Sequence, residues 1–183
     1  MYYLGIDLGG TTIKGAAVSP EGEILREDSR PTQPELGPDH VADGIAALMT
    51  ALTDRDGTPP AGVGVGCPGV VDPAAGLVRY SCNLRWGHFD LCSALRQRTG
   101  VEVQLVNDAN AAALAEAVAG CAKGAESAIV LTLGTGLGGG VVLNGKLLTG
   151  YTGTASELGH MVIEEGGAPC TCGRRGCWEA YSS

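Results

Sequence analysis

Four side chains near the end of the sequence have the types and spacing of a zinc site. In the pattern H-x9-C-x-C-x4-C they are His160, Cys170, Cys172 and Cys177. Zn²⁺ prefers thiolate and imidazole ligands, and three Cys with one His complete a tetrahedral shell that leaves no position open for catalysis. The spacing therefore predicts a closed, structural zinc site. Two carboxylates, Glu157 and Glu179, flank this segment.

Two glycine-rich turns have the chemistry of phosphate binding. One holds Asp7, Gly9, Gly10, Thr11 and Thr12, and the other holds Gly134, Thr135 and Gly136. Backbone amides and hydroxyls donate hydrogen bonds to phosphate oxygens, and a carboxylate can hold Mg²⁺ or its water. A pair of such turns could clamp a polyphosphate from both sides. From their glycine content alone, two tight hairpins are an equally good interpretation.

A third group of polar residues stands where an apolar strand is expected to meet a helix. Asn107 and Asp108 follow that strand directly. Asp108 fits two interpretations: a helix cap, which the bare position favours, or a general base at the edge of the sheet. Glu157 and His160 lie three positions apart and would share one face of a helical turn. Carboxylates and amides in such a group suit the recognition of sugar hydroxyls.

The elements expected to position these residues follow the order of an α/β domain with a mixed sheet. Strands are expected over 2–8, 13–18, 23–28, 61–66, 101–106, 128–133, 141–143 and 146–148, and helices over 38–54, 109–118 and a segment ending near 99. Asn144-Gly145 predicts a type I′ hairpin. Residues 127–148 repeat the layout of residues 2–18. We therefore expect two related domains, the first complete over 1–120 and the second only begun over 121–183.

Composition narrows the function classes. The chain has 183 residues, with 12 Lys and Arg against 20 Asp and Glu, so its net charge of −8 disfavours nucleic acid as a partner. No signal peptide or membrane span is expected, because no long apolar segment is free of glycine interruptions. Four of the seven Cys stand singly among apolar neighbours and are expected to be buried, namely Cys67, Cys82, Cys92 and Cys121. This cysteine usage predicts a cytoplasmic protein.

Six motifs together resemble the ROK family of sugar kinases and sugar-responsive repressors. In chain order they are Asp7-x-Gly9-Gly10-Thr11, Gly66-x-Pro68-Gly69-x-Val71-Asp72, Asn107-Asp108-Ala109-Asn110-Ala111-Ala112, Thr132-Leu133-Gly134-Thr135-Gly136-x-Gly138-Gly139-Gly140, Glu157-x-Gly159-His160 and Cys170-x-Cys172-Gly173-x-x-Gly176-Cys177-x-Glu179. They span nearly the whole chain in the family's order, and the resemblance is close to the bacterial glucokinases of that family. It implies an actin-like ATPase fold related to ribonuclease H, with ATP and Mg²⁺ at the glycine turns and a hexose in the cleft.

The resemblance also implies roles for single residues. Asp108 would be the general base that takes the proton from the 6-hydroxyl of the sugar. The other sugar-binding residues would be Gly69, Asn83, Asn107, Glu157, His160 and Glu179. Asp7 would act through Mg²⁺ on the phosphates, while Gly9, Gly10, Thr11, Thr12, Gly134, Thr135 and Gly136 would bind them. His160 would be shared between zinc and sugar.

Several points of function stay open at this stage. Glucose is the favoured hexose, but N-acetylmannosamine, N-acetylglucosamine and fructose are alternatives, because Ser156 and Trp178 depart from the family's pattern. Family kinases continue beyond the zinc segment through an adenosine-binding part, so we expect a fragment or truncated product with weak ATP binding and little kinase activity. A catalytically silent, zinc-stapled sugar-binding fragment is the alternative. A repressor role is disfavoured by the acidic charge and by the early position of Asp7. Full-length members are expected to form homodimers or homotetramers.

Overall fold

A computed structural model of the chain describes residues 1–53 and 57–183. The chain divides into two compact units, Met1–Asp108 and Ala109–Ser183. The domain boundary expected at residue 120 stays a prediction. Within the described residues, no helix combines the length and the apolarity that a membrane crossing requires.

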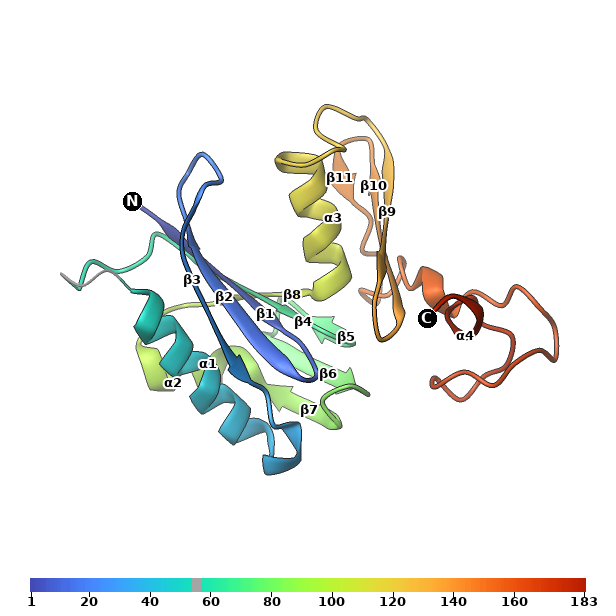
Figure 1. Cartoon of the computed structure of the whole chain (residues 1–183), viewed down its shortest axis with the longest axis horizontal. Coiled ribbons are helices and arrows are strands. Elements are labelled where there is room, and N and C mark those ends of the chain that lie inside the picture. Colours follow the sequence, from blue (N-terminus) through green and yellow to red (C-terminus); the bar gives the residue numbers. More distant parts are fainter. Residues whose placement is uncertain (54–56) are drawn as a thin grey trace. The chain divides into compact units, whose positions relative to one another are not determined.

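The first unit is built on a five-stranded mixed sheet of order β3-β2-β1-β4-β8 (Figure 1). Its strands are β1 (Tyr3–Leu8), β2 (Thr12–Val18), β3 (Ile24–Pro31), β4 (Val63–Cys67) and β8 (Gln104–Asn107). The first three form an antiparallel meander, whereas β4 runs parallel to β1 and β8 runs parallel to β4. The expected mixed sheet is confirmed, although β3 ends later and β8 begins later than the sequence indicated.

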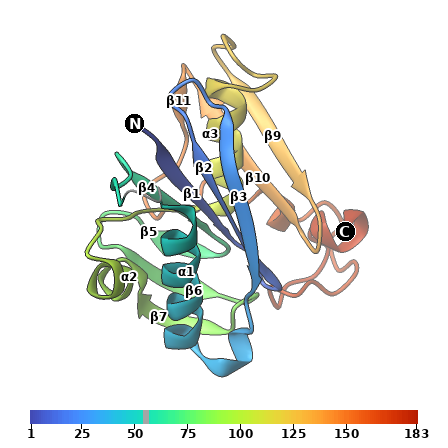
Figure 2. The same ribbon diagram turned by 60° about the vertical axis from the view of Figure 1, so that its left-hand side comes forward.

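Apolar side chains at every second position of β1 explain why this sheet has a buried face. Leu4, Ile6 and Leu8 are almost fully buried, while the residues between them are exposed. Helix α1 (Pro38–Leu52) packs against β2 and β3 (Figure 2), and its apolar residues are buried. The helix predicted over 38–54 is confirmed to Leu52, and its last residue lies outside the described residues.

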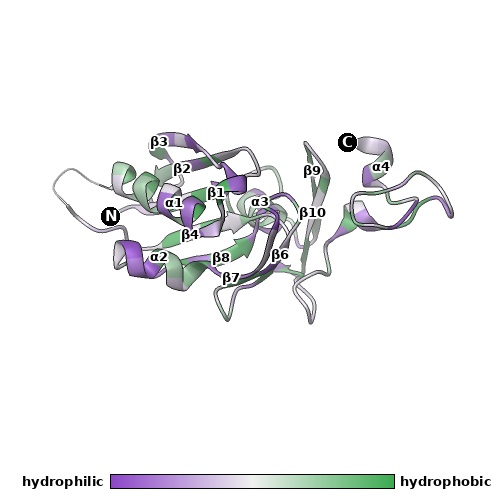
Figure 3. Ribbon diagram, turned by 90° about the horizontal axis from the view of Figure 1, so that it is seen from below, coloured by the Kyte–Doolittle hydropathy of each residue, from purple (hydrophilic) through white to green (hydrophobic). Residues whose placement is uncertain are grey.

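Helix α2 (Leu91–Thr99) packs beside α1 and confirms the helix expected to end near residue 99. Asp90 caps its first turn, since its Oδ1 accepts a hydrogen bond from the Ser93 amide at 2.9 Å. Arg98 bonds two carboxylates of α1, Asp39 at 2.9 Å and Asp43 at 2.6 Å. Figure 3 shows both hydrophilic and hydrophobic residues on α2, as expected of a helix with one buried face.

A second, small sheet in the first unit was not expected from the sequence. It has the order β5-β6-β7, with strands β5 (Val70–Asp72), β6 (Leu77–Ser81) and β7 (Trp86–Asp90). Strands of three and five residues are too short to show a period of two clearly, which is why pattern analysis missed them.

The second unit contains a three-stranded antiparallel sheet of order β11-β10-β9 and the helix α3. The bounds are α3 (Asp108–Val118), β9 (Ala128–Leu133), β10 (Leu137–Leu143) and β11 (Lys146–Leu147). Asn144 and Gly145 both have positive φ, 52° and 69°, as the predicted type I′ turn requires. After β11, the described chain has only two short helices, η2 (Leu158–His160) and α4 (Glu179–Ser182).

The expectation that the four scattered cysteines are buried is only half correct. Cys67 is buried and Cys92 is half-buried, but Cys82 and Cys121 are exposed. Cys82 lies in the turn between β6 and β7, and Cys121 lies in the turn after α3. Apolar neighbours in sequence do not bury a residue whose backbone is in a surface turn.

Candidate functional site

Three strands of the first unit end at one edge of the sheet, and the predicted site residues of this unit lie there. The parallel pairing aligns Asp7 of β1 with Gly66 of β4, and Cys67 of β4 with Asn107 of β8. Ligands of α/β folds bind outside the carboxyl ends of such strands. The sheet therefore brings a phosphate-turn carboxylate and the predicted sugar-binding amide to the same edge.

The first glycine turn, residues 9–12, is tight and braced. The Gly9 amide donates to the Thr12 carbonyl at 3.1 Å, and a Cβ at Gly9 would lie 2.8 Å from that oxygen. Thr32, which is fully buried, donates its hydroxyl to the Gly9 carbonyl at 2.7 Å and its amide to the Thr11 carbonyl at 2.9 Å. Sequence reasoning missed Thr32, because a single Thr after a strand carries no signal of such a contact.

A pocket of about 630 Å³ opens beside this turn. Its lining residues are Gly10, Thr11, Pro31, Gln33, Pro34, Glu35, Asn83 and Arg85. Gly10 approaches Asn83 closely, since a Cβ built on it would lie 3.4 Å from the Asn83 Cβ. The pocket thus joins part of the predicted phosphate turn to one predicted sugar-binding residue.

Three polar side chains of this pocket, Gln33, Glu35 and Arg85, were not among the predicted site residues. Gln33 and Arg85 both have left-handed backbones, with φ of 50° and 57°. Non-glycine residues in this region are uncommon and concentrate at functional sites. Because φ is not visible in a sequence, no signal in the chain pointed to them.

Asn107 and Gly69 are joined by a hydrogen bond. The Asn107 side chain is 8% exposed, and its Nδ2 donates to the Gly69 carbonyl at 3.1 Å. This bond fixes the orientation of the amide, since only Nδ2 can be the donor. Gly69 itself has φ of 98°. The two predicted sugar-binding residues are therefore neighbours in space despite the 38 positions between them.

Asp108 is the first residue of α3. The helix therefore begins one residue earlier than the sequence indicated, and Asp108 lies inside its first turn instead of just before it. A carboxylate in a first helical turn is stabilised by the helix dipole. Burial, and next to it the charge of Asp108, raise the pKa of the Cys67 thiol well above its usual range. Cys67 is part of the buried core of the first unit.

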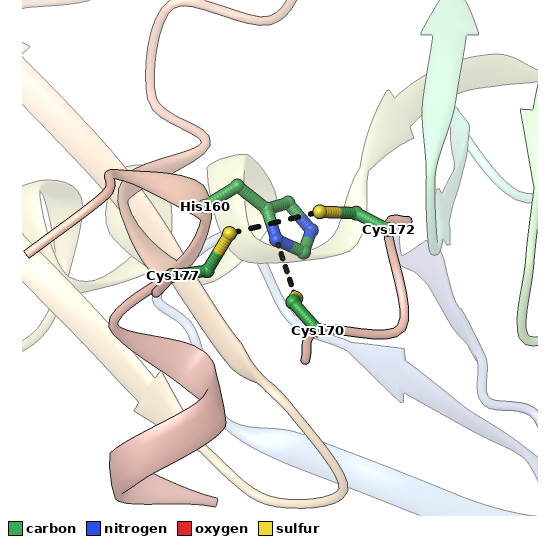
Figure 4. A group of neighbouring side chains, drawn as sticks. All are labelled: His160, Cys170, Cys172 and Cys177. Atoms are coloured by element: carbon green, nitrogen blue, oxygen red, sulfur yellow. Dashed lines mark hydrogen bonds between the residues drawn. The ribbon is translucent and has the colours of Figure 1, made fainter. Parts of the chain in front are cut away.

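The four predicted metal ligands of the second unit lie together, which confirms their grouping. Their ligand atoms are all within 4.8 Å of one another. Figure 4 shows the four side chains pointing toward one another. The Sγ atoms of Cys172 and Cys177 are 3.7 Å apart, and so are Cys170 Sγ and His160 Nδ1. Two ligand atoms each about 2.3 Å from a tetrahedral Zn²⁺ are separated by about 3.8 Å. The donor set and its spacing therefore fit zinc.

The backbone of the cysteine segment is folded by local hydrogen bonds. The Cys170 amide donates to the Arg174 carbonyl at 2.9 Å, and the Gly173 amide donates to the Cys170 carbonyl at 3.0 Å. A hydrogen bond from the Arg174 amide is the main cause that lowers the pKa of Cys172 to about 6, whereas burial raises the pKa of Cys177 to about 11. Cys172 is thus the thiol of this pair that most readily becomes a thiolate ligand.

The remaining predicted residues of the second unit surround this cluster. Glu157 precedes η2, and its carbonyl accepts a hydrogen bond from the His160 amide at 3.1 Å. Glu179 begins α4, and its Oε2 accepts a hydrogen bond from the Leu137 amide at 3.0 Å. Leu137 directly follows the second glycine turn, whose Gly134 amide donates to the Gly136 carbonyl at 3.0 Å.

The predicted sugar-binding residues thus fall into two groups. Those of the first unit are Gly69, Asn83, Asn107 and Asp108, and those of the second are Glu157, His160 and Glu179. In each unit, part of the group is gathered around one glycine turn. The contact between Glu179 and the second turn was not foreseen.

Both the fold and its relatives define the class of protein. The mixed sheet with a glycine turn after β1 is the arrangement of the actin-like ATPase fold. A solved structure described as a ROK family glucokinase from Streptomyces griseus in complex with glucose and AMPPNP matches with a TM-score of 0.90 and 38% identity, covering 100% of this chain and 57% of that one.

The family follows from the sequence comparison. The profile of the ROK family matches residues 3–183, and this chain belongs to that family. A glucokinase from Thermotoga maritima is 45% identical over 98% of this chain and 56% of its own length. A xylose repressor from Bacillus subtilis is 36% identical over 100% of this chain and 48% of its own length. The chain spans about half the length of the curated relatives that it matches.

Proposed function

We propose that this chain is the sugar-binding part of an ATP-dependent hexose kinase that phosphorylates glucose on its 6-hydroxyl. The observation that carries the proposal is the pair Asn107 and Asp108 at the end of β8. There, the buried amide is held by the Gly69 carbonyl and the next residue is a carboxylate. The similarity to the glucokinases of T. maritima and S. griseus supports glucose as the hexose.

Asp108 acts as the general base in this proposal. It accepts the proton of the sugar 6-hydroxyl as that oxygen attacks the γ-phosphorus of ATP, while the bond from the γ-phosphorus to the β,γ-bridging oxygen breaks and ADP leaves. Asn107, Asn83 and the Gly69 backbone bind other hydroxyls of the sugar, as do Glu157, His160 and Glu179 from the second unit. Because phosphoryl transfer needs little covalent work from the protein, positioning and charge stabilisation supply the rate.

The two glycine turns serve the nucleotide. Gly9, Gly10, Thr11 and Thr12 donate amide and hydroxyl hydrogen bonds to phosphate oxygens, and Gly134, Thr135 and Gly136 do the same from the second unit. Asp7 holds Mg²⁺ or its water, which offsets the negative charge of the phosphates. Arg85 lines the pocket beside the first turn and adds a positive charge there.

The proposed zinc ion would have a structural role. His160, Cys170, Cys172 and Cys177 would hold it, and with four protein ligands it would cross-link an irregular segment without supplying a Lewis-acid position. His160 faces the cluster with Nδ1. Its Nε2 is then free to meet a sugar hydroxyl, and metal binding at Nδ1 fixes which nitrogen carries the proton.

The test is the Asp108→Asn variant in a coupled assay of glucose-dependent ADP release. The assay is run on the 183-residue chain and on the full-length gene product. Removing a general base costs on the order of 10²- to 10⁴-fold in kcat, and we expect glucose binding by calorimetry to persist. A variant whose kcat stays within about threefold of the parent would contradict the role of Asp108. A panel of glucose, N-acetylmannosamine, N-acetylglucosamine and fructose identifies the hexose.

A second candidate function is sugar binding without catalysis. It is supported by the similarity to a xylose repressor. In that case the 183-residue chain would bind a sugar in calorimetry, ATP would not bind with or without it, and no ADP would form. We further propose a cytoplasmic homodimer or homotetramer for the full-length protein, to be checked by light scattering.

A further inference from the structure

The Glu179 carboxylate lies between the metal cluster and the second glycine turn. Its Oε2 accepts the hydrogen bond from the Leu137 amide at 3.0 Å, across 42 positions of sequence. Its Oε1 accepts a hydrogen bond from the Thr171 hydroxyl at 3.1 Å and lies 3.8 Å from Cys170 Sγ. One oxygen is thus bonded to the turn, and the other is bonded to the cysteine segment.

The position of Glu179 depends on the metal ligands around it. Cys177 is two residues before it, and Cys170 and Thr171 belong to the same loop as Cys172. The loop contains no regular helix or strand, and local backbone hydrogen bonds together with isolated bridges at Val162–Cys177 and Pro169–Arg175 connect it to the rest of the segment. A metal that ties four ligands together therefore restricts where the Glu179 carboxylate can lie.

The second glycine turn leaves room for the Glu179 carboxylate because Gly136 has no side chain. A Cβ added to Gly136 would lie 2.5 Å from Glu179 Oε2, closer than real Cβ contacts allow. A Cβ added to Gly134, two residues earlier in the same turn, would meet nothing within 4 Å. Of these two glycines, Gly136 alone is required for the close approach of Glu179.

We propose that Glu179 is a positioning residue through which the metal cluster sets the conformation of the second glycine turn. A hydrogen bond from an amide to a carboxylate is stronger than one between neutral groups, so it holds the Leu137 amide and the backbone before it. When the metal is lost, the cysteine segment loosens, Glu179 leaves the amide, and the turn becomes mobile. The metal thereby controls the phosphate side of the site as well as the sugar side, a consequence that rests on the function proposed above.

The experiment measures hydrogen exchange of the Leu137 amide by NMR, in the zinc-loaded protein and after chelation. This readout needs neither ATP nor sugar, so it remains informative if the kinase assignment fails. We expect chelation to speed exchange at Leu137 at least tenfold. Unchanged exchange after zinc removal would overturn the proposal.

Variants separate the Glu179 contact from general loss of structure. Glu179→Ala and Gly136→Ala are expected to speed Leu137 exchange at least tenfold while the protein keeps one zinc per chain. Glu179→Gln retains a carbonyl acceptor and should restore part of the protection. Gly134→Ala, the matched control, should leave Leu137 exchange unchanged. Equal exchange in Gly134→Ala and Gly136→Ala would contradict the proposal, as would full protection in Glu179→Ala.

A kinetic measurement adds the link to phosphate binding. In the full-length protein, Glu179→Gln is expected to raise the KM for ATP more than the KM for the hexose. If Glu179 only binds the sugar, the KM for the hexose rises more than the KM for ATP. If no phosphorylation occurs in any form of the protein, the proposed function fails, whereas the exchange data still decide whether Glu179 links the metal to the turn.

Discussion

Replacing Gly69 by Ala perturbs both the stability of the first unit and the predicted sugar site. Gly69 has φ of 98°, and a Cβ there would collide with the Tyr80 carbonyl oxygen and lie 2.9 Å from Ser81 Cα. The left-handed backbone costs an alanine about 1–2 kcal/mol. Forcing β5 and β6 apart adds about 1–3 kcal/mol, as overpacking does elsewhere. We therefore expect a loss of about 2–5 kcal/mol in the free energy of unfolding.

The matched control is Gly64→Ala in β4. Gly64 does not have positive φ, and a Cβ there meets nothing within 4 Å. The free energy of unfolding of the Gly64→Ala variant should differ from that of the parent by less than about 1 kcal/mol, because alanine destabilises a strand less than glycine does. Both variants are unfolded in urea and followed by the fluorescence of Trp86, which is 4% exposed. The other tryptophan, Trp178, is replaced by Phe so that only the first unit is observed.

The same variant tests the geometry of the site. Because the Gly69 carbonyl accepts the Asn107 hydrogen bond, displacing it should reorient the amide and weaken glucose binding. A loss of affinity of tenfold corresponds to about 1.4 kcal/mol, comparable to one lost hydrogen bond. If Gly69→Ala unfolds at the same urea concentration as Gly64→Ala and binds glucose equally well, the steric reasoning and the site assignment are both refuted.

Three further outcomes are expected. Chelation of the metal should abolish glucose binding while the Trp86 urea transition stays in place, and equal glucose binding after chelation would separate the cluster from the site. Asp90→Ala removes the acceptor of the Ser93 amide and should cost about 1 kcal/mol, which Asp90→Ser should largely restore. Leu48→Ala, at a fully buried position of α1, should cost about 2–5 kcal/mol in calorimetry. The exposed Leu36→Ala should change stability by less than about 0.5 kcal/mol, and a similar cost at both positions would contradict the assigned core.

The parts of the fold that could be predicted are those with strong local patterns. The apolar stripe of α1 extends over four turns, and Asn144-Gly145 suits the positive φ that a type I′ turn needs at both positions. The grouping of the four candidate metal ligands was also predictable, because they lie within 18 positions and ligand chemistry restricts which residue types can serve. Each of these signals is contained in a short segment.

What could not be predicted depends on contacts between distant segments. The hydrogen bond from Leu137 to Glu179 spans 42 positions, and no local pattern encodes it. The sheet β5-β6-β7 is built from strands too short to show their period. Arg85 lines the pocket beside the first glycine turn and has a left-handed backbone, and neither its residue type nor its neighbours in sequence indicate that conformation. The roles assigned to the sugar-binding residues stay predictions until the variants are measured.

The strand order of the first unit also constrains how quickly it can fold. The central strand β1 pairs with β2 across a three-residue turn, but its other neighbour, β4, begins only at Val63, and β8 begins at Gln104. Pairing β1 with β4 must close a long loop that includes α1, and such non-local contacts form slowly. Before β4 pairs with β1, the backbone N–H and C=O groups on that edge of β1 have no partner strand. A chain released early from synthesis would therefore hold an unpaired edge on its central strand, open to pairing with another chain.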